Sequence, residues 1–187
     1  EAQAEAATSE KAHSIAAREA ELVSAADAVV TLSNTMVAEL AARGADPAAI
    51  TVVPNGVDAA LLTEDLSPAE ARAALGLGND DAFLVGAVGA LVDYEGFDTL
   101  LRAVALLLES PNAPRQLIAR LHVLLAGDGA AAPGLRALAD ELGVSERVLM
   151  PGRVPRDRAR HWVQTLDVVV VPRRDVDVAR TVTPQKP

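Results

Sequence analysis

Residues 83–103 read FLVGAVGALVDYEGFDTLLRA and constrain the fold of this chain more than any other stretch. The apolar run Phe83–Val88 is too short to cross a membrane and is typical of a parallel strand covered on both faces. From Phe97 onward, apolar residues recur at the spacing of one helix face, at Leu100, Leu101, Val104 and Leu108. The stretch therefore predicts a strand, a turn and a helix that packs back onto the sheet.

Two glycines near the end of this strand, Gly86 and Gly89, would let the backbone approach a ligand closely. The N-terminus of the following helix offers unpaired N–H groups and a partial positive charge to an anion, most often a phosphate. Gly86-x-x-Gly89 is only part of the dinucleotide-binding fingerprint, and many strand-to-helix turns carry glycine without binding anything. A phosphate site and an ordinary turn both stay open at this point.

Strand patterns alternate with helix patterns along the rest of the chain. Helices are predicted over residues 9–26, from Ser33 or Asn34 to a stop at Gly44, over 67–75 behind a capping box, over 135–142 and over 156–166. Strands are predicted over residues 28–32, 50–53, 121–126, 148–150 and 168–171. The alternation predicts an α/β protein, with a Rossmann-like parallel sheet and helices on both faces.

Ligands bind such sheets in a crevice at the carboxyl ends of the strands. The predicted strand ends carry glycine, arginine and proline, at Gly89, Gly127 to Gly129, Gly152-Arg153 and Pro172-Arg173. Because four strand ends could meet at one crevice, together they indicate a binding site more specifically than any single turn.

Composition excludes several classes of site. The chain has no cysteine, which rules out disulfides and thiolate metal sites, and its three histidines show no metal-ligand spacing, so no metal is expected. A net charge of −9 argues against nucleic-acid binding, although residues 151–187 carry eight basic and four acidic side chains. No signal peptide and no transmembrane segment is recognisable, so the sequence predicts a soluble, cytoplasmic protein.

Pro54-Asn55-Gly56 breaks the chain sharply and predicts a connection between two units, residues 1–53 and 54–187. Two short strands and two helices cannot bury enough apolar surface to stand alone. Residues 1–53 are therefore expected to be the end of a domain whose beginning is absent.

Six phrases give the chain a family resemblance: AADAVVTLSNTMVAEL, ITVVPNGVD, VGALVDYEGFDTLLRA, LLAGDG, RVLMPGRVP and DVVVVPR. In order and spacing they resemble the retaining glycosyltransferases of family four, which have the two-domain GT-B fold, and they cover nearly the whole chain. The resemblance implies that residues 1–53 are the C-terminal end of the N-terminal, acceptor-binding domain. It likewise implies that residues 54–187 are the first part of the C-terminal, nucleotide-sugar-binding domain.

The same resemblance implies a set of donor-binding residues. Gly89 would face the pyrophosphate of the donor, Gly127 and Gly129 would line the nucleotide side, and Arg153 with Val154 would lie near the base. Nothing else in the sequence indicates a nucleophile elbow or a phosphate-loop lysine.

Two positions depart from the family pattern. Ala90 and Glu95 stand where the family usually has an arginine and a lysine that reach the donor phosphates, and Tyr94-Glu95-Gly96 is similar to a Tyr-Glu-Gly variant within the family. A pyrophosphate beside Glu95 would need positive charge from elsewhere. We hypothesise that Arg173 and Lys186 supply it; alternatively, Glu95 is simply a carboxylate that favours a helix start.

The resemblance implies transfer of a sugar, with retention, from a nucleotide-diphosphate sugar to an acceptor hydroxyl on a glycan, a lipid or a small molecule. No further cofactor is expected. The family's catalytic residues fall outside this chain, so an internal fragment without activity of its own is expected. A non-catalytic, Rossmann-like binding or partner module is the alternative. A dinucleotide-dependent oxidoreductase is disfavoured, because no acidic residue follows the turn at the end of a second strand.

Overall fold

The computed structural model describes residues 2–56, 66–78, 81–176 and 179, with side chains from residue 14 onward in those ranges. The described residues up to 56 belong to one compact unit, and those from 66 onward to a second. Lys186, one of the predicted donor-binding residues, lies outside the described residues. The assignment of the two units to an acceptor domain and a donor domain stays a prediction.

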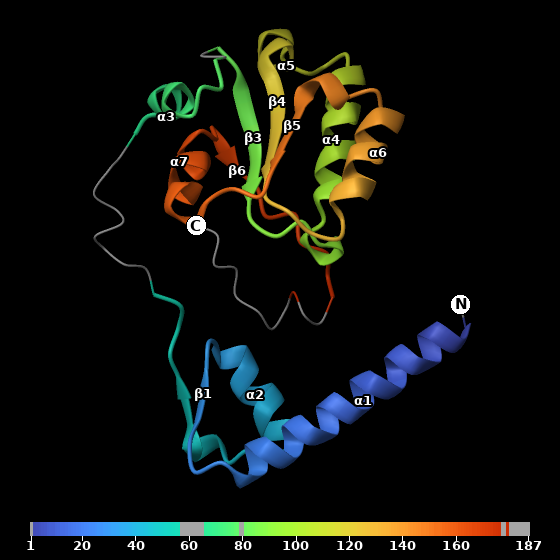
Figure 1. Cartoon of the computed structure of the whole chain (residues 1–187), viewed down its shortest axis with the longest axis vertical. Coiled ribbons are helices and arrows are strands. Elements are labelled where there is room, and N and C mark those ends of the chain that lie inside the picture. Colours follow the sequence, from blue (N-terminus) through green and yellow to red (C-terminus); the bar gives the residue numbers. More distant parts are fainter. Residues whose placement is uncertain (1, 57–65, 79–80, 177–178, 180–187) are drawn as a thin grey trace. The chain divides into compact units, whose positions relative to one another are not determined.

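The first unit pairs two short strands beside a helix (Figure 1). Its elements are α1 (Ala2–Ala25), β1 (Val29–Thr31), α2 (Asn34–Ala42), the 3₁₀ turn η1 (Pro47–Ala49) and β2 (Ile50–Val52). The strands are parallel, and Ser33 caps α2 by accepting a hydrogen bond from the Met36 N–H at 3.3 Å. Helix α1 begins seven residues earlier than predicted, because its first residues are rich in alanine, the strongest helix former.

The second unit is an α/β layered domain built on one sheet (Figure 1). Its helices are α3 (Pro68–Ala74), α4 (Phe97–Glu109), α5 (Arg115–Arg120), α6 (Ala132–Glu141) and α7 (Ala159–Gln164). Its strands are β3 (Phe83–Val88), β4 (Leu121–Ala126), β5 (Val148–Gly152) and β6 (Val168–Val169). The 3₁₀ turns η3 (Asp93–Glu95), η4 (Ser145–Arg147) and η5 (Arg156–Arg158) complete it. The strands lie in the order β5-β4-β3-β6, and all three pairings are parallel.

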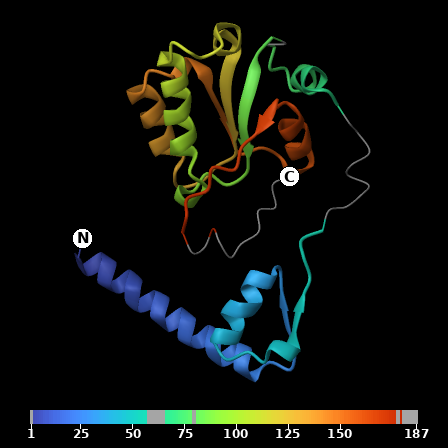
Figure 2. The same cartoon turned by 180° about the vertical axis from the view of Figure 1, so that it is seen from behind.

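Helices cover both faces of this sheet, α4 and α6 on one and α3 and α7 on the other, as two opposite views agree (Figure 1, Figure 2). The larger core cluster lies under α4 and α6 and includes Leu101, Leu125 and Leu135. The smaller one, on the other face, includes Leu124 and Leu166, with the only tryptophan, Trp162, packed against it. The predicted fold class, a Rossmann-like parallel sheet with helices on both faces, is confirmed.

Most predicted elements of this unit are confirmed, and the differences have local causes. Strand β6 is shorter than the predicted 168–171, and Pro172, which has no N–H to donate, follows soon after. The predicted helix 156–166 begins as the 3₁₀ turn η5 and becomes α-helical only at Ala159. Helix α5 was not predicted, because six residues are too few to show a helical period.

Candidate functional site

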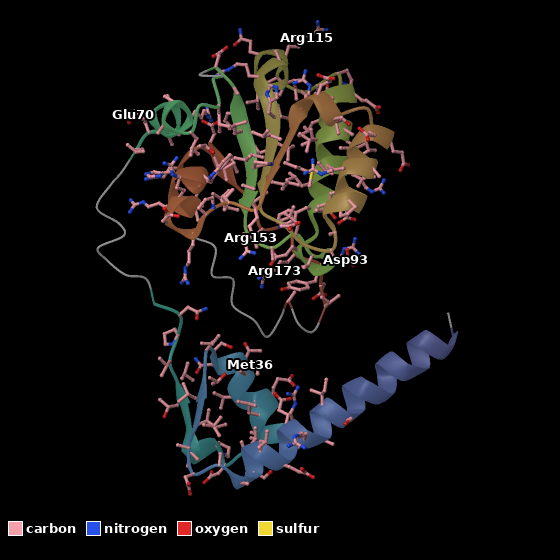
Figure 3. The ribbon with its side chains drawn as sticks, in the orientation of Figure 1. Met36, Glu70, Asp93, Arg115, Arg153 and Arg173 are labelled. Atoms are coloured by element: carbon pink, nitrogen blue, oxygen red, sulfur yellow. The ribbon has the colours of Figure 1, made fainter. Side chains whose placement is uncertain are left out.

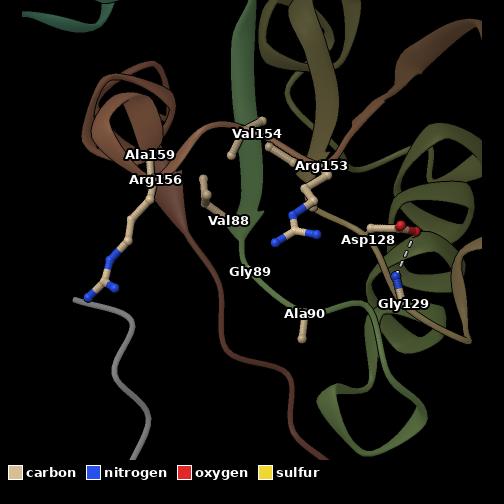
Figure 4. A pocket seen from close by; sticks show the side chains of 11 residues that line it. Val88, Gly89, Ala90, Asp128, Gly129, Arg153, Val154, Arg156 and Ala159 are labelled. Carbon is tan, nitrogen blue, oxygen red and sulfur yellow. Dashed lines mark hydrogen bonds between the residues drawn. The ribbon is translucent and has the colours of Figure 1, made fainter.

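A pocket of about 550 Å³ opens at the carboxyl ends of β3, β4 and β5 (Figure 4). Eleven residues from the strand ends, the loops that follow them and the start of α7 line it: Val88, Gly89, Ala90, Ala126, Gly127, Asp128, Gly129, Arg153, Val154, Arg156 and Ala159. This is the edge of a parallel sheet where ligands are expected to bind. Six of the predicted donor-binding residues therefore meet at one pocket.

Backbone hydrogen bonds join the loops that form the pocket. The Gly89 N–H donates to the Ala126 carbonyl at 2.9 Å, and the Gly127 N–H donates to the Gly152 carbonyl at 2.9 Å. A Cβ atom on Gly127 would lie 1.8 Å from the Gly89 carbonyl oxygen. Glycine at position 127 is thus explained by the close approach of two loops. Close approach of a ligand, which the sequence suggested, is not needed to explain it.

Charged side chains enter the pocket from both sides (Figure 4). The Arg153 guanidinium is directed toward the Gly89–Ala90 stretch. Arg156 lies on the other side of the pocket, and its guanidinium is directed away from that stretch. The Asp128 carboxylate accepts a hydrogen bond from the Gly129 N–H at 2.8 Å, so it shapes its own turn as well as lining the pocket. The lining thus contains two cations and one anion.

Glu95, Gly96 and Arg173 do not line this pocket. Arg173 lies at the same edge of the sheet as Arg153 (Figure 3), and it forms a second cluster there with Glu95 and Gly96. An Arg173 guanidinium nitrogen lies 3.1 Å from a Glu95 carboxylate oxygen, and these side chains are only 13% and 4% exposed. The guanidinium also lies over the Tyr94 ring, 5.8 Å from its centroid. Arg173 therefore balances the negative charge of Glu95, and Glu95 is not an exposed carboxylate at a helix start.

The helix-start carboxylate of α4 is Asp98, which forms an ion pair with Arg174 at 2.8 Å. Burial alone would raise the pKa of Asp98. The hydrogen bond and charge of Arg174 and two backbone N–H groups outweigh burial, so the pKa is lowered. None of the first residues of α4 lines the pocket, because η3 and Gly96 separate the helix from Gly89. The expectation that the N-terminus of this helix faces an anion therefore stays a prediction.

Sequence reasoning missed four lining residues: Val88, Ala126, Arg156 and Ala159. Arg156 begins the turn η5 three residues after Arg153, and no signal in the sequence separates it from the other arginines of this end of the chain. Val88, Ala126 and Ala159 are apolar, and nothing in the sequence distinguished them from core residues. Asp128 was considered as a group that could orient a hydroxyl or shape a turn, and it was not included among the predicted donor-binding residues.

The described residues contain no group of three or more histidine, aspartate and glutamate side chains that could hold a metal ion. No described helix is both long enough and apolar enough to span a bilayer.

Two family models match the chain. Residues 70–177 match the family described as glycosyl transferases group 1, and residues 4–61 match glycosyltransferase family 4. The first match covers more than half of the chain and contains the whole pocket.

Curated relatives include two proteins named D-inositol 3-phosphate glycosyltransferase. The one from Thermomonospora curvata is 36% identical over 141 residues, which cover 69% of this chain and 31% of that protein. The one from Mycolicibacterium gilvum is 41% identical over 133 residues, which cover 68% of this chain and 27% of that protein. This chain thus spans about a third of the length of these relatives.

Two solved structures share the fold. HepE from Anabaena, solved in complex with UDP, aligns with a TM-score of 0.62 at 23% identity and covers 79% of this chain and 38% of that chain. Sucrose-phosphate synthase from Thermosynechococcus elongatus aligns with a TM-score of 0.64 at 24% identity and covers 83% of this chain and 37% of that chain.

Proposed function

This chain belongs to the group 1 glycosyl transferases, and from that premise we propose that its pocket binds the nucleoside diphosphate part of a sugar donor. The observation that carries the proposal is the convergence of three strand ends on one pocket within the matched region. Two arginines line that pocket, and arginine is well suited to phosphate oxygens. The chain is therefore part of an enzyme that moves a sugar from such a donor to an acceptor hydroxyl.

The ligand class has support from a related fold. HepE was solved with UDP and with UDP-glucose, and its fold aligns with this chain. We propose that the pocket of this chain also binds a nucleoside diphosphate, and we assign neither the base nor the sugar. Gly89 and Ala90 would then border the diphosphate, Gly127 and Gly129 the nucleotide, and Arg153 with Val154 the base.

The remaining parts of the function are also proposals. Retention at the sugar carbon, the two-domain arrangement with an acceptor domain over residues 1–53, and a cytoplasmic location stay predictions. So does the acceptor, whether a glycan, a lipid or a small molecule. The name D-inositol 3-phosphate glycosyltransferase indicates an inositol phosphate acceptor for the two relatives.

A melting experiment with UDP, GDP and ADP tests the proposal on the full chain. A ligand that binds only the folded state at 100 times its Kd stabilises that state by about 2.7 kcal/mol, which raises the Tm by about 5–10 °C in a chain of this size. Ala90→Asp, which adds negative charge to the pocket lining, should reduce the shift. Ala119→Asp, on the exposed part of α5, should not.

A shift that only one of the three nucleotides produces would support the donor site and identify its base. No shift with any of them would favour the alternative, a non-catalytic Rossmann-like binding or partner module. One observation favours that alternative: position 90 is an alanine, where the family resemblance implies an arginine that reaches the donor phosphates.

A further inference from the structure

Glu95 and Arg173 are oppositely charged, largely buried and 78 residues apart in sequence. A buried ion pair gives little net stability compared with well-packed apolar residues, because both charges lose their hydration. Removing either partner alone, in contrast, leaves an uncompensated buried charge. Stability alone therefore does not account for this pair, and holding one side chain in place for another purpose is the better explanation.

The backbone segments that carry Glu95 and Arg173 are also in close contact. The Arg174 N–H donates to the Tyr94 carbonyl at 2.9 Å. Gly96 has φ +73°, and a Cβ atom there would lie 2.1 Å from the Pro172 carbonyl oxygen. The segment that follows β6 therefore packs directly on the Tyr94–Gly96 turn. Together with the Tyr94 ring below the guanidinium, these contacts leave Arg173 little freedom to move.

The sheet register brings this cluster to the edge that holds the pocket. Strands β3 and β6 are adjacent and parallel, with Gly86 opposite Val169, and the Val170 N–H donates to the Gly86 carbonyl at 2.8 Å. Gly89 comes three residues after Gly86 and lines the pocket. Pro172 comes three residues after Val169 and precedes Arg173. Arg173 thus follows β6 at the same level at which the pocket loop follows β3.

Electrostatics then gives the pair a role. A diphosphate bound against Gly89 and Ala90 would have the Arg153 guanidinium beside it but no charge from those two residues, and a lone carboxylate at Glu95 would repel it. Pairing with Arg173 cancels that repulsion. A guanidinium presents its N–H donors in a planar fork, and this fork matches phosphate oxygens.

We propose that Glu95 is a positioning residue, whose carboxylate holds the Arg173 guanidinium where it contacts the donor's diphosphate. This inference rests on the proposed donor site and deepens it. The acidic residue at position 95 then promotes phosphate binding indirectly, through the arginine that it orients.

The test compares two neighbouring ion pairs that join the same two segments. Glu95→Gln, Arg173→Gln and the double variant probe the proposed pair; Asp98→Asn and Arg174→Gln probe the more exposed Asp98–Arg174 pair. Titration calorimetry on the full chain measures the affinities for UDP and for uridine. If the melting experiment identifies GDP or ADP as the ligand instead of UDP, that diphosphate and its nucleoside replace UDP and uridine.

Glu95→Gln and Arg173→Gln should each weaken UDP about tenfold or more, the worth of a charge-assisted hydrogen bond. Uridine, which lacks phosphates, should bind all variants within about twofold of wild type. The double variant should be no weaker than Arg173→Gln alone, because Glu95 acts through Arg173. Both control variants should retain wild-type affinity for UDP and uridine.

Two results would overturn the positioning role. One is wild-type UDP affinity in Glu95→Gln while Arg173→Gln is weakened; the other is a lowered Tm in both variants with unchanged UDP affinity. If either glutamine variant fails to fold, Glu95→Asp and Arg173→Lys keep the charges and shift the geometry, and a UDP-specific loss is again required. Wild-type protein that binds none of the three diphosphates refutes the donor site itself, which separates that failure from failure of this inference.

Discussion

Replacing Gly127 by alanine is expected to pull apart the two loops that line the pocket. Gly127 has φ +150°, and its Cβ would lie 1.8 Å from the Gly89 carbonyl oxygen, well below any real contact. The obstructing atom belongs to the backbone, so rotating a side chain cannot relieve the clash. The β3 and β4 loops must move, and the hydrogen bonds from the Gly89 and Gly127 N–H groups are expected to break.

The free energy of unfolding should fall by about 3–5 kcal/mol. Two lost backbone hydrogen bonds account for about 1 kcal/mol each, and a non-glycine residue at this φ adds about 1–3 kcal/mol. Gly143→Ala is the matched control, since Gly143 also has positive φ (+67°) but has nothing within 4 Å of its would-be Cβ. It should lose only the conformational part, about 1–2 kcal/mol.

Urea unfolding followed by fluorescence measures both variants. Trp162 is the only tryptophan and packs against the smaller core cluster, so its emission reports on the second unit. UDP-induced melting shifts should shrink in Gly127→Ala and persist in Gly143→Ala. If Gly127→Ala costs no more than Gly143→Ala, the close contact between the two loops is not what requires glycine, and the explanation given for the pocket glycines is refuted.

Three further changes have defined outcomes. Arg72→Met should lower the unfolding free energy of the second unit by about 3–5 kcal/mol in urea titrations, because Arg72 is 3% exposed and binds the Asp167 carboxylate at 2.5 Å; no loss would refute this structural role. Gly134→Ala should add about 0.5–1 kcal/mol in the same assay, since its site within α6 is open and alanine favours helix; a loss would show hidden crowding. The Asp98→Asn variant should be less stable than wild type by under about 1 kcal/mol at pH 7, because the pair with Arg174 is partly exposed. Because the pKa of Asp98 is lowered in the folded state, this difference in stability should vanish as the pH falls through the folded-state pKa. A difference in stability that persists at low pH would show that packing, and not charge, causes it.

Local signals in the sequence were enough to predict the sheet and most of its helices. Strands β3 and β4 have the predicted bounds, because each apolar run is followed at once by glycine. Helix α3 carries the predicted capping box, in which Ser67 and Glu70 bond each other's backbone N–H groups. Such signals depend on neighbouring residues, which the sequence displays directly.

The site was predicted less completely, because it depends on contacts between distant residues. The sequence located Gly127 at the pocket but gave no sign that another loop requires glycine there, since that loop lies 38 residues earlier in the chain. It also identified Glu95 and Arg173 as important without revealing that they bind each other. Composition showed eight basic residues after position 150, and nothing in their order distinguishes the one that faces Glu95.

The burial of Arg173 makes salt a further test of where the diphosphate is held. At physiological ionic strength the screening length is about 8 Å, so the net charge of −9 matters less to a bound phosphate than the few charges beside it. Arg153 and Arg156 are exposed, and an anion held by them should lose affinity steeply as salt rises. Arg173 is 13% exposed, so its interactions are screened much less. UDP binding that persists at high salt in wild type, but becomes salt-sensitive in Glu95→Gln, would show that the buried pair holds the phosphates; equal salt sensitivity in both would assign them to the exposed arginines.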